Sequence, residues 1–229
     1  MNNWLLYDLG GGPRPLKFCW VIDVHKAVTL PVLALLLWFY VQRMPEPTSA
    51  APFVYVAMHG AYGLAWLLKA VTFPDPNWQV HITLPSTVIV LVSLTLYWSI
   101  GWLLISGTVV PQYPFDERVW LGMCVVISTM GIAIMLAADA QKYFTLRVRR
   151  GLITDGMFRY VRHPNYLGEM MIYTGLALMV WHWYPPLLLG CIWTGLFAVN
   201  MVMKEASMSR YSEWEAYRAR TWWIIPGLL

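Results

Sequence analysis

Six apolar runs, each long enough to cross a bilayer, constrain this chain more than any other feature of its sequence. A transmembrane helix needs about 20 mostly apolar residues. The predicted spans are Val21–Val41, Pro52–Val71, Leu84–Ile105, Val119–Ala140, Asn165–Trp183 and Pro185–Met203. Only 12% of the residues are charged, about half the share that is usual in a soluble domain. The predicted fold class is therefore all-α, a polytopic membrane bundle of about six helices.

The basic residues predict the orientation of these spans. If both termini lie in the cytosol, 14 of the 16 Lys and Arg fall in cytosolic segments, and only Arg43 and Arg118 remain outside. Short cytosolic loops carry such an excess of Lys and Arg. Topology and anionic headgroups account for the net charge of +4, so we expect a lipid bilayer as partner and no nucleic acid. The expected location is the bacterial inner membrane or the endoplasmic reticulum membrane.

The basic residues are concentrated in the second half of the chain. Ten of the 14 cytosolic cations lie between Lys142 and Arg220, more than orientation requires. The excess predicts an anion bound at the cytosolic face, between the fourth span, the fifth span and the tail. From these features alone, one membrane domain with a basic cytosolic tail is the simplest division of the chain.

The three cysteines predict neither a disulfide framework nor a metal site. Cys19, Cys124 and Cys191 are widely spaced along the chain, without metal-ligand spacing. We expect them to behave as small buried hydrophobes.

The stretch "GLITDGMFRYVRHPNYLGE", residues 151–169, carries charges directly before and inside an apolar run. Arg159 and Arg162 are three residues apart, so we expect both to face one side of a helical turn. The residue before a proline is pushed extended, which breaks the chain at His163. Pro164 can then open the fifth span, and the free amides of that first turn suit an anion.

Three residues just inside the fifth span extend this prediction. Asn165 lies at the start of the helix, Gly168 leaves room for a flat ring to approach the backbone, and Glu169 lies about one turn in. A buried carboxylate needs a donor from the protein or from a ligand. The alternative is a membrane-entry turn with snorkelling arginines, which explains neither Asn165 nor Glu169.

These residues carry a resemblance to a known group of membrane enzymes. "RHPNYLGE" before an apolar helix resembles the C-terminal signature of membrane sterol reductases and steroid 5α-reductases. Three further stretches are similar to the same group: "ADAQK" at the end of the fourth span, "KEASMSRYSEWEAY" at residues 204–217, and the ending "IIPGLL". The resemblance covers roughly residues 121–229, which it implies to be a cofactor-binding core with a basic cytosolic tail. Residues 1–120 are then the expected substrate side. The general scaffold is shared with isoprenylcysteine carboxyl methyltransferases and phospholipid methyltransferases.

The resemblance implies an NADPH-dependent membrane reductase of a C=C bond in a lipid, which could be a sterol, a steroid-like enone or an isoprenoid. Asn165, the acidic Glu169 and the "QK" pair at residues 141–142 match the reductases. Ten basic residues also suit the phosphates of NADPH. The first alternative is a methyltransferase that uses S-adenosylmethionine. The second is a lipid-binding membrane protein without catalysis.

The resemblance and the charges together assign the expected cofactor contacts, namely Gln141, Lys142, Arg159, Arg162, His163, Asn165, Tyr166, Glu169, Trp214, Tyr217 and Arg220. The four cations would hold phosphates, with His163 ordering the turn or bonding a ribose or phosphate. Asn165 and Glu169 would hold the nicotinamide. Tyr166 is a cofactor contact or an interface anchor.

Two further groups of residues have open roles. We expect Trp214 and Tyr217 either to cover the adenine of the cofactor or to belong to an amphipathic interfacial helix. We expect Arg147, Arg149 and Arg150 either to bind the phosphates of the cofactor or to face lipid headgroups.

Reduction of a C=C bond also needs a proton, and a phenol is a suitable donor. The catalytic candidates are Glu169, Tyr173, Tyr62 and Tyr97. Glu169 and Tyr173 are four residues apart and can share one helix face. For each tyrosine the alternative is a satisfied interior polar group. The short loops leave no room for a large extramembrane pocket, so we expect a lipid substrate that enters from the bilayer.

Overall fold

The computed structural model describes residues 4–43 and 49–228. These residues form two compact units, each described by itself. The first unit comprises residues 1–124 and 176–185, and the second comprises residues 125–175 and 186–229.

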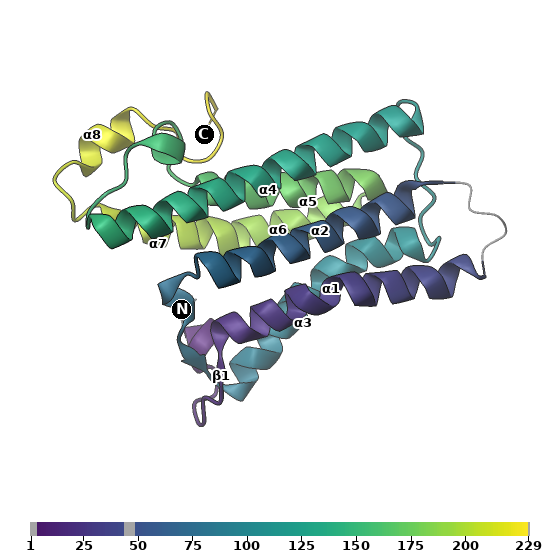
Figure 1. Ribbon diagram of the computed structural model, residues 1–229, viewed down its shortest axis with the longest axis horizontal. Coiled ribbons are helices and arrows are strands. Elements are labelled where there is room, and N and C mark those ends of the chain that lie inside the picture. Colours follow the sequence, from purple (N-terminus) through teal and green to yellow (C-terminus); the bar gives the residue numbers. More distant parts are fainter. Residues whose placement is uncertain (1–3, 44–48, 229) are drawn as a thin grey trace. The chain divides into compact units, whose positions relative to one another are not determined.

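Within the described residues, five helices are long and apolar enough to cross a membrane, which confirms the predicted all-α membrane bundle (Figure 1). They are α1 (Phe18–Val41), α2 (Ala51–Thr72), α3 (Leu84–Ile105), α4 (Glu117–Val148) and a continuous helical run over Tyr184–Met208. That last run consists of α6 (Tyr184–Ile192), a π-helical segment (Trp193–Ala198) and α7 (Val199–Met208).

The fifth predicted span is a shorter helix than expected. It corresponds to α5 (Pro164–Val180), whose 17 residues extend over about 25 Å. That length lies at the lower limit for crossing the hydrocarbon core. Further elements are α8 (Trp214–Ala219) in the tail, and strand β1 (Leu16–Lys17) paired antiparallel with β2 (His81–Ile82). Short helical turns cover Trp4–Asp8, Pro76–Trp78 and Gly156–Phe158.

Helix α4 is longer than the sequence predicted. The expected span ended at Ala140, but the helix continues to Val148. The segment after Ala140 is rich in basic residues, but it contains no glycine or proline until Gly151, where φ is +136°. The last turns of α4 therefore extend beyond the predicted span and carry Lys142 and Arg147.

In the first unit, α1 lies against both α2 and α3 (Figure 1). Glycines allow the close approach: a Cβ atom on Gly63 of α2 would lie 2.7 Å from the backbone oxygen of Lys26 on α1. On α3, Gly101 makes room for the ring of Tyr55, which is fully buried. Aromatic and polar side chains are thus packed between these three helices.

In the second unit, α4 and α5 cross at Gly131 and Gly168. A Cβ atom on Gly168 would lie 2.6 Å from the backbone oxygen of Gly131 and 2.6 Å from the backbone nitrogen of Met135. The expectation that Gly168 leaves room for a flat ring is therefore wrong, because the backbone of α4 fills that space. A separate hydrophobic cluster joins α5, the π-helical segment, α7 and the tail through Tyr166, Phe197, Met201 and Ile224.

The cysteines also differ in part from expectation. Cys19 and Cys124 are buried, but Cys191 on α6 is exposed. An exposed, weakly polar thiol fits a helix whose outer face meets lipid.

Candidate functional site

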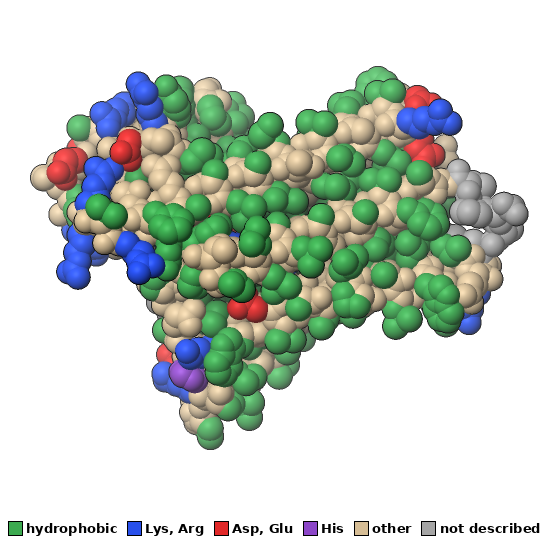
Figure 2. Space-filling view, viewed as in Figure 1, with side chains coloured by type: hydrophobic (Ala, Val, Ile, Leu, Met, Phe, Trp, Pro, Cys, Tyr) green, Lys and Arg blue, Asp and Glu red, His purple; other side chains and the backbone are tan. Residues whose placement is uncertain are grey.

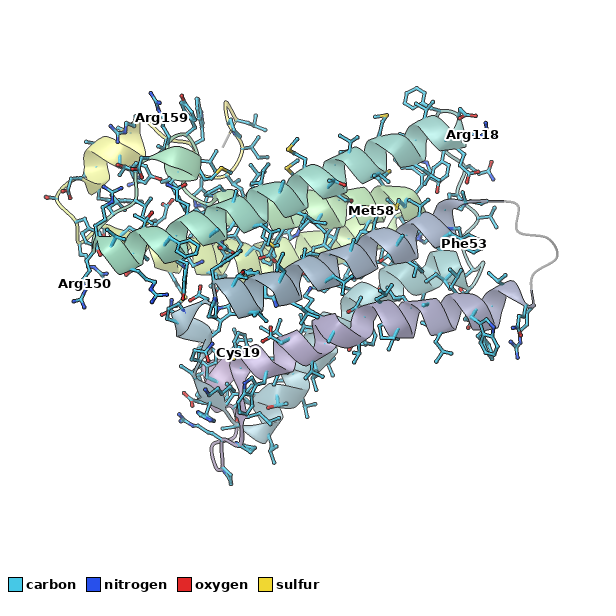
Figure 3. All side chains as sticks on the ribbon, in the orientation of Figure 1. Cys19, Phe53, Met58, Arg118, Arg150 and Arg159 are labelled. Carbon is cyan, nitrogen blue, oxygen red and sulfur yellow. The ribbon has the colours of Figure 1, made fainter. Side chains whose placement is uncertain are left out.

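The second unit carries the whole charge surplus of the protein. It contains ten Lys and Arg against six Asp and Glu, a net charge of +4, whereas the first unit contains six of each. Figure 2 shows Lys and Arg gathered at the end of this unit that holds α8. Arg150 and Arg159 both lie at that end (Figure 3).

Gln141 on α4 holds the turn that follows this helix. Its side chain donates to the backbone oxygen of Asp155 at 2.9 Å and accepts from the backbone N–H of Met157 at 2.7 Å. Arg149 forms an ion pair with Asp155 at 2.9 Å. The amide of Gln141 is thus used to position the 3₁₀ turn Gly156–Phe158. Lys142, the next residue of α4, is half-buried.

Arg159 and Arg162 do not share one side of a helical turn, which corrects the sequence-based expectation. The helical turn ends at Phe158, and Val161 forms a bridge with Trp222 of the tail. Arg159 is exposed, with its guanidinium 5.3 Å from the centre of the Tyr160 ring. The bridge turns Arg162 in the other direction, into the protein.

Arg162 forms the centre of a group that we call the arginine latch, made of Arg162, Glu205 and Thr221. Its Nε donates to Glu205 Oε1 at 2.6 Å, and its Nη1 donates to the backbone oxygen of Thr221. The side chain is 9% exposed. The backbone N–H of Arg162 also donates to the oxygen of Trp222 at 2.9 Å. The latch therefore ties the start of α5 to α7 and to the tail.

His163 lies beneath the latch and is 2% exposed. Its Nε2 is 3.4 Å from Glu205 Oε1, within ion-pair range but not aligned as a hydrogen bond. Burial lowers the pKa of His163, and the contact with Glu205 opposes this only in part. The ring packs edge-on against Tyr166 and Trp223. His163 therefore orders the turn before α5.

The tail residues of α8 face inward. Trp214 and Tyr217 are 4% and 2% exposed, and the Tyr217 hydroxyl donates to the backbone oxygen of Phe158 at 2.8 Å. Burial raises the pKa of Tyr217 to about 12. Both rings thus fix the tail to the turn before α5, while Arg220 remains exposed.

The first turns of α5 place three of the predicted residues on one face. Asn165, Glu169 and Tyr173 follow each other at intervals of four, so they share one side of the helix. Asn165 and Glu169 are half-buried, and Tyr173 is 2% exposed. Beside them, the ring of Tyr166 lies 4.5 Å from Lys204 Nζ. This face of α5 therefore carries an amide, a carboxyl group and a phenol.

The two tyrosine candidates of the first unit are buried on different helices. Tyr62 on α2 is 1% exposed, with Lys26 Nζ 4.1 Å from the centre of its ring. Tyr97 on α3 is 7% exposed. Tyr55 was not among the predicted residues, and its hydroxyl lies 3.2 Å from Nδ1 of His59. The four-residue spacing of these two on one apolar helix was the available signal.

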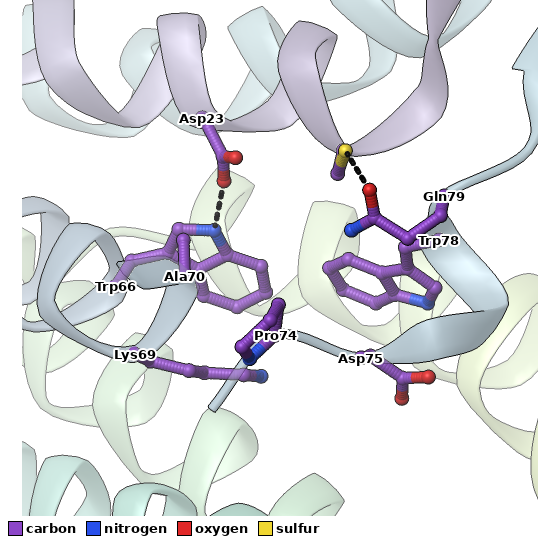
Figure 4. Close-up of a pocket in the computed structure, with 9 residues that line it drawn as sticks. Asp23, Trp66, Lys69, Ala70, Pro74, Asp75, Trp78 and Gln79 are labelled. Atoms are coloured by element: carbon purple, nitrogen blue, oxygen red, sulfur yellow. Dashed lines mark hydrogen bonds between the residues drawn. The ribbon is translucent and has the colours of Figure 1, made fainter. Parts of the chain in front are cut away.

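A small pocket lies at the end of α1 and α2 in the first unit (Figure 4). Asp23 accepts a hydrogen bond from Trp66 Nε1 at 3.1 Å, and Lys69 Nζ lies 4.3 Å from the centre of the Trp66 ring. Trp78 stacks on Trp66 with 5.3 Å between ring centres. The enclosed space is about 30 Å³, enough for a water molecule and far too small for a dinucleotide.

Comparison with known proteins supports the resemblance seen in the sequence. The family described as "Protein of unknown function (DUF1295)" matches residues 14–221. A steroid 5-alpha-reductase, DET2, of Solanum lycopersicum is 40% identical over 77 residues, 31% of this chain and 30% of that protein. An uncharacterized protein of Schizosaccharomyces pombe is 37% identical over 49 residues, 21% of this chain and 18% of that protein.

These matches are partial for the individual relatives and nearly complete for the family. The matched stretches span less than a third of the length of either curated relative. No solved structure matches the chain. The family match covers most of the sequence. The chain therefore belongs to the DUF1295 family and, with it, to the steroid 5α-reductase-like superfamily.

Proposed function

We propose that this protein is a membrane reductase that uses NADPH to reduce a C=C bond in a lipid. The observation that carries the proposal is the position of the charge surplus. The exposed cations of the second unit gather at the end where α5 begins, and the first turns of α5 carry Asn165 and Glu169. The superfamily and the printed name of the Solanum lycopersicum relative support a reductase of a steroid or another lipid.

The chemistry of the exposed cations fits the phosphates of NADPH. Arg150, Arg159 and Arg220 are exposed and make no ion pair with any residue that the structure describes. Guanidinium groups bind phosphates through paired hydrogen bonds. We propose Arg159, Arg220 and the half-buried Lys142 as the phosphate ligands. Arg162 and Gln141 would act as positioning residues, because the arginine latch and the turn engage their side chains.

The roles on α5 follow from the shared helix face. When bound, NADPH would supply a hydride to one carbon of the lipid C=C bond. Asn165 and Glu169 would hold the carboxamide of the nicotinamide through hydrogen bonds. Tyr173, one turn further along, would donate the proton that the second carbon requires. Tyr62 and Tyr97 of the first unit remain alternative donors.

The membrane placement is part of the same proposal. NADPH is a cytosolic cofactor, so the charge-rich end of the second unit would face the cytosol, in the bacterial inner membrane or the endoplasmic reticulum membrane. Reporter fusions after Asn77 and Arg150 should then give cytosolic signals, and fusions after Ser49 and Gln112 should not. A cytosolic signal after Gln112 would contradict this orientation.

The decisive experiment follows the hydride. The purified protein is incubated with NADPH that carries deuterium at the transferable position and with a panel of enone lipids, and the products are analysed by mass spectrometry. We expect one deuterium at a former alkene carbon. NADPH should also raise the melting temperature more than NADH or S-adenosylmethionine, because ligands that bind the folded state stabilise it. Stabilisation by S-adenosylmethionine without deuterium transfer to any enone would overturn the proposal.

A further inference from the structure

His25 on α1 is an unusual buried side chain. It is 4% exposed, and neither ring nitrogen has a hydrogen-bond partner among the residues that the structure describes. The imidazole stacks on the indole of Trp98, with 4.5 Å between ring centres and 16° between the ring planes. Buried polar groups are nearly always hydrogen-bonded, so a side chain held in this state calls for an explanation.

The surroundings of His25 are fixed by interactions that do not use its ring nitrogens. Thr29, one turn along α1, donates to the backbone oxygen of His25 at 2.8 Å and accepts from Trp98 Nε1 at 3.1 Å. This bond keeps the indole against the imidazole. The neighbouring polar groups have partners of their own, as the pair of Tyr55 and His59 on α2 illustrates. The packing therefore orients the imidazole without satisfying it.

We infer that His25 is the polar anchor of a lipid-binding site inside the first unit. The site would take a lipid through one oxygen function, a carbonyl or a hydroxyl group. A neutral imidazole offers one N–H donor and one acceptor nitrogen, so a carbonyl can accept from it and a hydroxyl can serve either nitrogen. Ionisable side chains inside membrane spans commonly mark ligand sites. This inference rests on the proposed function only in choosing an oxygenated sterol as the first lipid to test.

The aromatic ring that stacks on His25, and the buried aromatic side chains of α2, favour a flat apolar skeleton beside the oxygen. Trp98 presents a ring face next to the imidazole. Tyr55 and Tyr62 are fully buried on α2, which packs against α1 where Gly63 meets the backbone oxygen of Lys26, the residue after His25. A purely hydrocarbon ligand should bind less well, because it would leave the buried nitrogens unsatisfied.

The test compares two ligands with one skeleton. Cholest-4-en-3-one carries a ketone, and cholest-4-ene is the same molecule without the oxygen. Their affinities for the purified protein in lipid nanodiscs are measured without any cofactor. We expect the wild-type protein to bind the ketone about tenfold more tightly, the effect of one satisfied hydrogen bond in a buried site. H25F should reduce this ratio to about one, and H25Q should retain part of it. H81F, at an exposed histidine of the same unit, should keep the wild-type ratio.

Three results would overturn the inference. They are failure of both probes to bind, a ratio near one in the wild-type protein, and a ratio unchanged by H25F. If H25F does not fold, H25L takes its place, since a full wild-type ratio in H25L would also exclude the anchor. Because the assay contains no NADPH, it can succeed even if stabilisation by NADPH and deuterium transfer both fail. The two proposals are therefore separable.

Discussion

Arg162 Nε lies 2.6 Å from Glu205 Oε1, and this ion pair joins the residue before the His163–Pro164 break to helix α7. The two side chains are 9% and 18% exposed. The same guanidinium donates to the backbone oxygen of Thr221 in the tail. One arginine thus connects three segments that are far apart in the sequence, directly beside the first turn of α5.

The first prediction concerns this arginine latch. E205Q removes the charge that compensates Arg162 and should lower the free energy of unfolding by about 3 kcal/mol, since breaking a buried pair leaves one charge uncompensated. R162K keeps the charge but loses the fork of donors, so it should also lower the melting temperature. Both variants should weaken NADPH binding, because the start of α5 loses its position. Thermal melts and NADPH titrations in detergent measure both effects.

A different result would show that Arg162 is a direct phosphate ligand. In that case E205Q should leave the affinity for NADPH unchanged or increase it, because the guanidinium would lose a competing carboxylate. R210K, at an exposed arginine of the same unit, serves as the control and should change neither quantity.

The second prediction concerns the crossing of α4 and α5. In G168A the added methyl group meets backbone atoms of Gly131 and Met135 that cannot rotate away. We expect a loss of about 1–3 kcal/mol, the usual cost of overpacking. G190A on α6, where a Cβ atom meets nothing within 4 Å, should be neutral or stabilise the protein by up to about 1 kcal/mol. Equal melting temperatures for the two variants would contradict the close crossing.

The spans were predictable because their signals are local. A run of apolar residues and its bounding turn residues determine a transmembrane helix without reference to distant segments, and the bounds of α3 match the prediction at both ends. The extension of α4 was missed because its arginines resemble a loop in composition. A helix that leaves the bilayer can continue in water, provided that no glycine or proline interrupts it.

The side-chain directions in the site were not predictable in the same way. Arg162 turns inward because Val161 pairs with Trp222, which is about 60 residues away in the sequence. Gly168 packs on Gly131, a residue of another helix. The sequence shows that Arg159 and Arg162 are three residues apart and that Gly168 has no side chain, but it does not show what these residues contact. Their contacts depend on tertiary packing between distant segments, which a local sequence pattern cannot predict.

The third prediction concerns pH. Burial lowers the pKa of His163 below its ordinary value of 6.5, so as pH falls below 6.5 the unfolded chain binds a proton that the folded protein resists. Stability should therefore be full above pH 6.5 and decrease as pH falls toward 5. H163Q removes this contribution, so its melting temperature should decrease less between pH 7 and pH 5 than that of the wild-type protein. A steeper decrease in H163Q would reverse the sign of the argument. H182Q, in the other unit, is the control.

The last prediction tests Glu169, the acid inside α5. E169Q keeps the size of the side chain and removes its charge, so the protein should fold with a nearly unchanged melting temperature. In the proposed site the carboxylate fixes the nicotinamide, while Lys142, Arg159 and Arg220 bind the phosphates. Deuterium transfer into the enone should therefore fall by about 100-fold or more, with NADPH affinity reduced by no more than a few fold, the pattern of an interaction used mainly in the transition state. E213Q, at an exposed acid of the same unit, should change neither quantity. If E169Q instead lowers NADPH affinity and deuterium transfer by the same factor, Glu169 contributes uniform binding and its assigned role at the nicotinamide is wrong.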